Sequence, residues 1–279
     1  MSMFLQRRTW KGALAVLAAL CVAAGVTAAT SGARSTTYKV DHQLCYTASG
    51  KFAPPTGAKV RLIDQFSPNG FVPVIQSAMV LHCNPVLKVI KTSAGQKSYV
   101  PTNPRAHLAC LPIALPGQTV STPKVLVKNQ FGYAILYLGQ PNLLCLPSWK
   151  SLTGPPNLKP TTPPGLNHFT CYPVKGVGGG SYKPTGAVYL RDEFSSKLVS
   201  VGINPIPKEL CLPTKKIVTT SAGSTAYPMI DPATHLLCFQ VSKTPFKPKV
   251  WDENQFGTSA VTITATKWLC LPSTKQIVK

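Results

Sequence analysis

A motif of about fifty residues occurs four times in this chain, and it constrains the fold more than any other feature. Each copy opens with His-x-x-Cys, runs through a strand-like segment to a short Asn/Asp-Gln/Glu-Phe element, and closes with Cys-x-Pro-x-x-Lys. The clearest copy extends from His235 to Lys275. A repeat of this regularity reflects the architecture of the protein, so single residues have to be interpreted within it.

The four copies alternate between two types, A and B. The central Phe and the closing Cys are 17 residues apart in copies one and three, and 14 apart in copies two and four. Copies one and three have Asp two residues before that Phe, whereas copies two and four have Asn. The order A-B-A-B indicates that an A-B unit was duplicated after A and B had diverged.

Several short markers, namely Cys-Tyr, Asp-Gln-Phe, Leu-Cys-x-Pro and Asn-Gln-Phe-Gly, follow one another along the chain. On these markers, residues 41 to 279 resemble a family of secreted bacterial repeat proteins whose Cys-containing β-repeat domain has no known function. The segment Leu81-His82-Cys83 departs from the pattern by the His before its Cys. The resemblance implies an exported, β-rich protein and brings no catalytic residues with it.

Residues 1–29 have the composition of an export signal. A basic start with Arg7, Arg8 and Lys11 precedes an apolar run from Gly12 to Val26, and small residues follow it. The run is shorter than the ~20 residues that a membrane-spanning helix needs. We therefore expect a cleaved signal peptide, no transmembrane segment in the mature chain, and a secreted or cell-surface location.

Loss of this segment would remove one of the nine cysteines and leave eight, two in each repeat. An even number of cysteines in an exported chain is typical of a disulfide framework. Sequence alone permits 105 pairings of eight cysteines. Because a unit that is duplicated whole should contain its own bridge, we expect one disulfide within each repeat: Cys45–Cys83, Cys110–Cys145, Cys171–Cys211 and Cys238–Cys270.

The periodicity within the repeats is that of β-strands, as in the β-branched run from Ala260 to Thr266. Prolines and glycines separate these runs. The sequence thus predicts an all-β protein with four disulfide-linked repeats, arranged as two sandwich- or barrel-like A-B domains at residues 30–150 and 168–279. The proline-rich residues 151–167 should form a semi-rigid linker between them.

Four histidines occupy the same repeat position: His42, His107, His168 and His235. Each could form a metal site with the two cysteines of its repeat, but a cysteine in a disulfide is not a thiolate ligand. We therefore expect structural histidines, no metal and no cofactor. His82 is the one unrepeated histidine, and no nucleophile motif surrounds it.

The chain contains only eight acidic residues and no glycine-rich phosphate loop. A hydrolase with paired carboxylates would have to draw on these few, and adjacent acids in a strand point to opposite faces. No catalytic residue is predicted. An extracellular enzyme acting on cell-wall polymer is the alternative to a binding module. For the repeated central element we expect a turn capped by its Asn or Asp, with the Phe in the core.

Charge is the compositional feature with functional content. The chain carries a net +21, or about +18 after loss of the signal. A basic surface attracts anionic cell-wall or extracellular polymers. The lysines are dispersed and outnumber the arginines, so specific nucleic-acid recognition is not indicated. The sequence predicts a secreted or cell-surface structural and binding module, and it does not indicate an oligomeric state.

Overall fold

The computed structural model describes residues 40–246 and 248–278, which belong to one compact unit, Thr37–Lys279. The described residues form β-strands, turns and bends, which confirms the all-β prediction. No helix in this part of the chain is long and apolar enough to cross a membrane. The predicted signal peptide, residues 1–29, lies outside the described residues.

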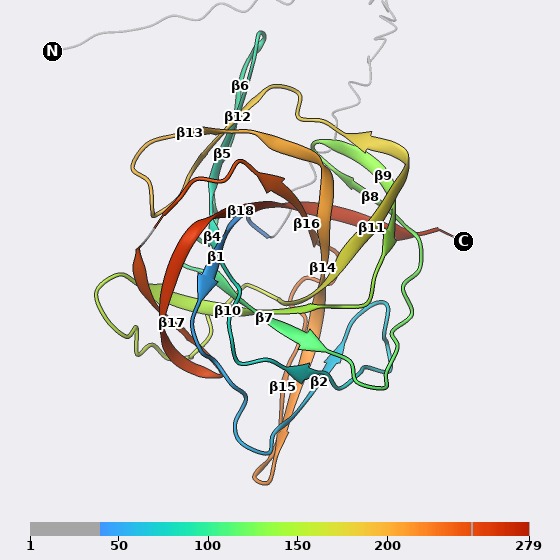
Figure 1. The fold of residues 1–279 in the computed structure, drawn as a ribbon, viewed down its shortest axis with the longest axis vertical. Helices are drawn as coiled ribbons and strands as arrows, with labels where there is room; N and C mark the ends of the chain where they lie inside the picture. The colour runs from blue at the N-terminus through green and yellow to red at the C-terminus, as the bar shows by residue number, and fades with distance from the viewer. Residues whose placement is uncertain (1–39, 247, 279) are drawn as a thin grey trace, which may run out of the picture. The chain divides into compact units, whose positions relative to one another are not determined.

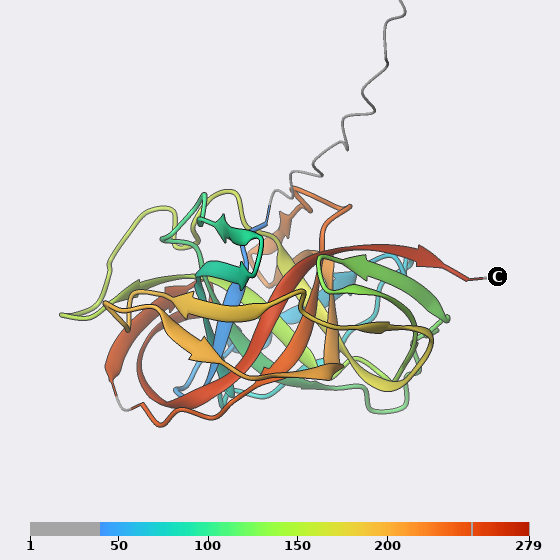
Figure 2. The same cartoon turned by 90° about the horizontal axis from the view of Figure 1, so that it is seen from above.

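Eight strands, two from each repeat, close into a cylinder (Figure 1). All neighbours are antiparallel, and the last strand of the chain pairs with the first. Figure 2 shows this last strand, in red, running obliquely across the ring. In order around the wall they are β1 (Gln43–Ser49), β4 (Leu81–Pro85), β7 (His107–Ala114), β10 (Leu143–Ser151), β11 (His168–Tyr182), β14 (Ile203–Thr220), β16 (His235–Val241) and β18 (Gly257–Ile277).

The opening and closing strands of each repeat are neighbours in the wall. Their cysteines stand directly opposite each other in the strand register, which places the sulfur atoms within bonding distance. The four disulfides are those that the duplicated unit predicts: Cys45–Cys83, Cys110–Cys145, Cys171–Cys211 and Cys238–Cys270.

The cysteines lie inside the cylinder. Since every second residue of a strand faces the same side of the sheet, Leu81, Leu143 and Trp268, each two residues from a cysteine, face the interior with them. The four disulfides form a ring there, with sulfurs of adjacent repeats 3.7 Å apart (Cys45 and Cys270) and 3.8 Å apart (Cys145 and Cys171). Leucines, Phe169 and Trp268 fill the remaining space and leave a void of about 10 Å³. The interior is therefore a packed core and has no room for a ligand.

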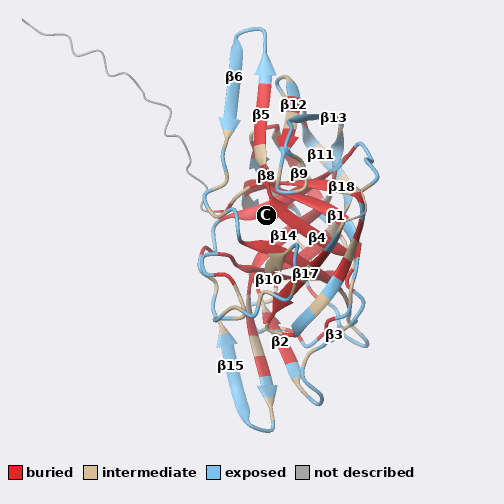
Figure 3. Ribbon diagram, turned by 90° about the vertical axis from the view of Figure 1, so that its left-hand side faces the viewer, coloured by how far each residue is buried: buried red, intermediate tan, exposed pale blue. Residues whose placement is uncertain are grey.

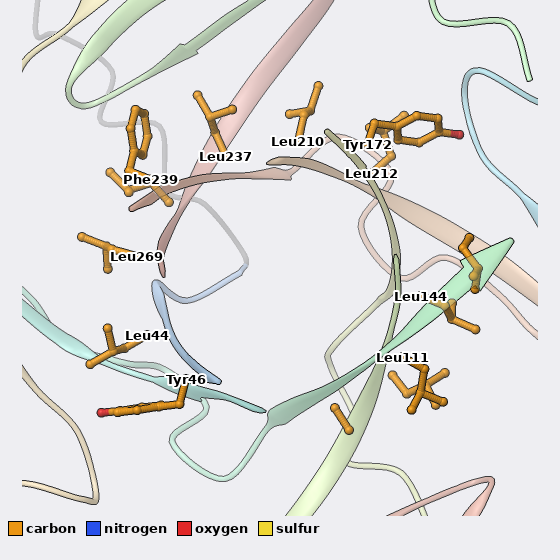
Figure 4. Packing of buried hydrophobic residues seen from close by; sticks show 14 of the residues in the cluster. Leu44, Tyr46, Leu111, Leu144, Tyr172, Leu210, Leu212, Leu237, Phe239 and Leu269 are labelled. Carbon is orange, nitrogen blue, oxygen red and sulfur yellow. The ribbon is translucent and has the colours of Figure 1, made fainter. Parts of the chain in front are cut away.

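The residues on either side of each cysteine point away from the cylinder. Figure 4 shows Leu44, Leu111, Leu210 and Leu269 projecting outward from the ring of strands. They form a second, larger core between the wall and the outer strands. The outer strands are β2 (Lys59–Ile63), β3 (Val74–Ile75), β5 (Leu87–Thr92), β6 (Gly95–Tyr99), β8 (Val125–Asn129), β9 (Gly132–Leu138), β12 (Ala187–Arg191), β13 (Val199–Val201), β15 (Gly223–Tyr227) and β17 (Lys249–Asn254).

The strand before each central Phe crosses to the repeat of the same type. In the A repeats, β2 of the first repeat pairs with β14 of the third, and β12 of the third repeat pairs with β5. Strand β5 follows β4 directly in the chain. In the B repeats, β8 pairs with β18 and β17 pairs with β10. Each repeat therefore completes the sheet of its like repeat across the ring.

This exchange differs from the expected arrangement of two separate A-B domains at residues 30–150 and 168–279. Four consecutive strands of the wall come from each half, but the outer strands β2, β8, β12 and β17 each pair with a strand of the other half, so the halves form one compact unit. The residues 151–167, expected to be a spacer, are bonded to distant parts of it: the Leu158 amide donates to Glu253 at 2.9 Å, and Asn103 donates to the Pro164 carbonyl at 3.0 Å. The physical reason is that the outer strand before each central Phe pairs with the other half, so neither A-B pair covers its outward-facing core with its own strands alone.

Two exposed hairpins, β5–β6 and β14–β15, extend from opposite ends of the view in Figure 3. They contain the Thr-Ser-Ala-Gly sequence that the two halves share. Gly95 and Gly223 have φ angles of 131° and 124°, which glycine adopts without a steric penalty. The repeated glycine is thus explained by the turn.

Candidate functional site

The four repeated histidines contact the central element of the next repeat in the chain. Each ring faces a Gln or Glu side chain, and the fourth repeat contacts the first, so the contacts continue around the ring. The pairs are His42 with Gln130, His107 with Glu193, His168 with Gln255 and His235 with Gln65. Each of these histidines thus joins its own repeat to the next one.

Burial sets the protonation state of these histidines. It lowers the pKa of His42, His107 and His168 well below 6.5, and nearby lysines lower it further. The pKa of His235 is lowered to about 4 by burial and by the charge of Lys275. The four rings are therefore neutral at pH 7. Among the described residues, no group of three or more His, Cys, Asp or Glu side chains is placed to hold a metal ion.

The closing Lys of each repeat lies against the central Phe of the next repeat. The distances from Nζ to the ring centroid are 5.0 Å for Lys88 and Phe131, 4.2 Å for Lys150 and Phe194, 4.5 Å for Lys216 and Phe256, and 4.7 Å for Lys275 and Phe66. Such contacts are attractive because a ring face is electronegative.

Two of these lysines, Lys88 and Lys216, are fully buried and their amines have no hydrogen-bond partner. Burial lowers the pKa of Lys88 to about 6 and that of Lys216 well below 10.5. These lysines are structural and contribute little to the surface charge. Sequence reasoning assigned no role to them, although their fixed place in every repeat was a signal.

The central element forms the expected turn. In all four repeats the Phe amide donates to the Asp or Asn side chain two residues earlier, at 2.8 to 3.0 Å. Phe66, Phe131 and Phe256 are buried, and Phe194 is partly buried. The capped turn therefore fixes the Phe in the outer core, as the repeat predicts.

The second polar atom of each Asp or Asn side chain contacts the like repeat across the ring. In the A repeats a tyrosine donates to the Asp, and in the B repeats a serine lies near the Asn amide. The pairs are Tyr46 and Asp192 (2.7 Å), Tyr172 and Asp64 (2.7 Å), Ser273 and Asn129 (3.4 Å), and Ser148 and Asn254 (3.3 Å). Each contact joins two A repeats or two B repeats. The Asp of an A repeat is therefore matched by a tyrosine in the other A repeat, and the Asn of a B repeat by a serine in the other B repeat.

Four residues that break the repeat gather in one part of the outer core, and we term them the polar quadrant: His82, Asn84, Glu193 and Asp252. The other three repeats have leucine or valine in place of His82, Asn84 and Asp252, and Gln in place of Glu193. The four residues come from three different repeats. Their convergence would be missed in the linear sequence, since only the strand exchange brings them together.

A continuous network connects the polar quadrant. The His82 ring lies 2.8 Å from Asp252 Oδ2 and 2.7 Å from Asn84 Oδ1. Lys150 Nζ donates to Asn84 Oδ1 at 3.0 Å and lies 2.9 Å from Glu193 Oε2. His82, Asn84 and Asp252 are fully buried, so a substrate has no access to them. The network holds the central Asp-Glu-Phe element of the third repeat, the second A element, in place and is not an open active site.

An apolar hollow of about 170 Å³ lies beside this network. Tyr46, Phe194 and Phe246 form one side of it, with ring centroids 5.2 to 6.2 Å apart. Asp192, which also borders the hollow, already accepts hydrogen bonds from Tyr46, Asn84 and the Phe194 amide. No polar group in this set is left free to orient a ligand.

A larger hollow, about 450 Å³, opens at one end of the cylinder, and we term it the Glu209 hollow. Glu209 stands two residues before the closing Cys, where the other repeats have Leu81, Leu143 and Trp268 inside the cylinder. The residues that surround Glu209 there include Lys208, Lys243, Lys267, Gln240 and Trp268.

The Glu209 carboxyl group is only partly satisfied. Its Oε1 accepts a hydrogen bond from Asn142 at 3.1 Å, while its Oε2 is buried without a partner. Burial raises the pKa of Glu209 to about 7, opposed by Asn142 and by the charges of Lys267 and Lys175. Glu209 is the only acid that borders the hollow, so a second carboxylate for hydrolysis is missing from it. The arrangement is suited to binding an anion that also carries hydroxyl groups.

The exposed charged side chains are almost all cationic. Fifteen of the described Lys and Arg residues are exposed, whereas Glu193 is the only described acid in that class. Asp64, Glu209, Asp231, Asp252 and Glu253 are buried. The charge imbalance of the sequence is therefore stronger on the surface than in the composition.

The fold and these contacts define a closed, disulfide-linked β-repeat protein. A family model described as "Repeat of unknown function (DUF7450)" matches residues 107–272, which run from the opening His of the second repeat to the closing Pro of the fourth. The chain belongs to this family of repeats. No curated protein matches the chain, and no solved structure matches it.

Proposed function

We propose that the protein is a secreted or cell-surface structural and binding module whose basic surface associates with anionic polymers. The observation that carries the proposal is the separation of charge: among the described residues most of the cations are exposed and most of the acids are buried. Such a surface produces a positive potential that concentrates polyanions around the molecule. Four disulfides are typical of an oxidising, extracellular compartment.

The association we propose is distributed over the surface. The exposed lysines lie on many strands and loops, and no compact basic run stands out. Exposed charges interact across water, so salt should weaken the attraction strongly. The rigid ring would then present its charges in fixed positions to a flexible polymer, without reading a sequence of bases.

Retention on an immobilised polyanion such as heparin tests this proposal. The oxidised protein should bind at about 50 mM salt and elute well before about 1 M, where the screening length is only ~3 Å. Passage without retention, or retention that ignores ionic strength, would contradict it.

Two matched variants test whether the charge is distributed. One replaces Lys51, Lys59, Lys128 and Lys249 with Gln, and the other replaces Lys91, Lys97, Lys183 and Lys197; all eight side chains are exposed. Both variants should elute earlier and by similar amounts. If only one of them changes, a single patch carries the binding and the distributed model is wrong.

A further inference from the structure

We propose that the Glu209 hollow is a specific site for one anionic saccharide unit, that is, a sugar that carries a carboxylate or phosphate beside free hydroxyl groups. The inference rests on the proposed function, because it names the unit of the polyanion that is recognised. Three observations support it independently: an unsatisfied buried group, a break in the repeat, and the chemistry of the surrounding side chains.

The first observation is the free oxygen of Glu209. A buried polar atom without a partner costs about 1–3 kcal/mol, so it calls for an explanation. Glu209 is 5% exposed, and its Oε2 has no hydrogen-bond partner among the described residues. Because Oε2 itself has no exposed surface, a ligand hydroxyl would supply that partner after the Glu209 side chain rotates toward the hollow that it borders. Sites that hydrogen-bond a hydroxyl in this way discriminate strongly against ligands that lack it.

The second observation is that Glu209 places a carboxyl group at a position that is apolar in the other three repeats. Leu81 and Leu143 show that the cylinder accepts leucine there, and Trp268 shows that it accepts a large apolar ring. Replacement of an apolar side chain by a carboxyl group loses burial energy and adds a desolvation cost. The fold alone therefore gives no reason for Glu209.

The third observation is the set of groups around it. Lys208 from β14, Lys267 from β18 and Lys243 after β16 border the hollow, and the charge of Lys175 on β11 also acts on Glu209. The uncharged polar residues that border the hollow are Gln240, Thr47 and Thr266, and the Thr266 hydroxyl already donates to the Ser242 carbonyl and accepts from the Thr244 amide. Ammonium groups would bind the anionic group of the sugar, and the Gln240 amide and the Thr47 hydroxyl would bind its hydroxyls. Volumes of ~300–1,000 Å³ are usual for small-ligand sites.

The same geometry couples binding to a proton. A bound anion repels the ionised carboxylate, so binding raises the pKa of Glu209 further above its free value of about 7. The ligand then binds more tightly when Glu209 is protonated, and its affinity falls as the pH rises through 7. With a free pKa near 7, the affinity should be lower at pH 8 than at pH 6 by up to about tenfold, the limit in which only the protonated form binds.

A titration with D-glucuronate, followed through the indole NH signal of Trp268, tests the site. Its carboxylate stays ionised throughout, so the pH dependence belongs to the protein. We expect binding at pH 6, weaker binding at pH 8 by up to about tenfold, and no shift of the Trp268 signal with D-glucose. A titration with glucose 6-phosphate at pH 6 shows whether the site binds a sugar phosphate as well as it binds a sugar carboxylate. Equal binding of inorganic phosphate, or of D-glucose, would overturn the proposal.

Two variants separate the roles of the lining residues. Glu209→Gln should bind glucuronate with the same affinity at pH 6 and pH 8, and Lys267→Gln should bind it several-fold more weakly at pH 6. An unchanged pH dependence in Glu209→Gln would contradict the assignment. Heparin retention should be nearly unaffected in Glu209→Gln. If heparin retention is present but glucuronate does not bind, this inference fails alone; if retention is absent, the proposed function fails.

Discussion

The polar quadrant and its counterpart in the other half of the ring are equally buried but chemically opposite. By the A-B duplication, His82, Asn84 and Asp252 correspond to Leu210, Leu212 and Val127, and all six are fully buried. One half holds its A element with hydrogen bonds and charges, and the other half does so with apolar packing. Corresponding positions in the two halves thus share their backbone position and their burial, but their side chains are polar in one half and apolar in the other.

The largest effect should come from His82→Leu, which places the counterpart's residue in the polar quadrant. The change removes the partner of Asp252 Oδ2, and Asp252 Oδ1 has none already. A buried charge without a partner costs about 3–5 kcal/mol. Unfolding in denaturant should show a loss of that size. The matched change Leu210→Met in the counterpart conserves volume and should cost less than about 1.5 kcal/mol.

The double change His82→Leu with Asp252→Val serves as the control for this interpretation. It removes both partners and gives the residues found at the counterpart. Because apolar replacement of a complete buried pair is often close to neutral, the double variant should recover most of the stability. A double variant as unstable as His82→Leu would show that the loss comes from packing and not from the unpaired charge.

A smaller effect is expected in the pH dependence of stability, where His107 and His235 are the corresponding residues. Both have a folded-state pKa below 6.5, so the unfolded chain binds more protons and stability falls as the pH drops below 6.5. For His235 this loss should extend down to about pH 4, at no more than about 1.4 kcal/mol per pH unit.

The comparison of His235→Gln and His107→Gln checks this. Each variant should show a shallower fall in the free energy of unfolding below pH 6.5 than the parent protein. Curves that stay parallel to the parent would mean that these histidines are not buried neutral.

The smallest effect should come from Glu193→Gln, which makes the second A element match Gln65 of the first. Glu193 lies 2.9 Å from Lys150, but its side chain is 41% exposed, so solvent screens the pair. Exposed ion pairs contribute about 0–1 kcal/mol, and we expect a loss in that range that shrinks with added salt. A loss well above it would mean that Glu193 is integral to the buried network. The reverse change Gln65→Glu should be near neutral.

Much of the molecule could be predicted from the sequence. The repeat gave the strands, the capped turn before each Phe, and a pairing of cysteines that the register of the strands explains. The two-domain arrangement was wrong because periodicity identifies a strand without identifying its partner. The matched A and B sets contained that information, since Tyr46 and Tyr172 exchange partners between A repeats.

The sites were harder to predict for a different reason. Lys88 and Lys216 belong to a residue type that is normally at the surface, so composition places them wrongly. Glu209 and the polar quadrant stand out only when the copies are aligned and their differences are compared. The features shared by all copies describe the fold, and the differences between copies mark the candidate functional residues.

The closed ring has a consequence for how the chain folds. Each disulfide joins cysteines of one repeat, so each bridge is able to form as soon as its own repeat has reached an oxidising compartment. The strand exchange follows the opposite order: β1 lacks its neighbour β18, and β2 lacks β14, until distant parts of the chain have appeared. Sequence-distant pairing of this kind is slow. We therefore expect the four disulfides to form before the cylinder closes, which happens only when β18, the last strand of the chain, pairs with β1.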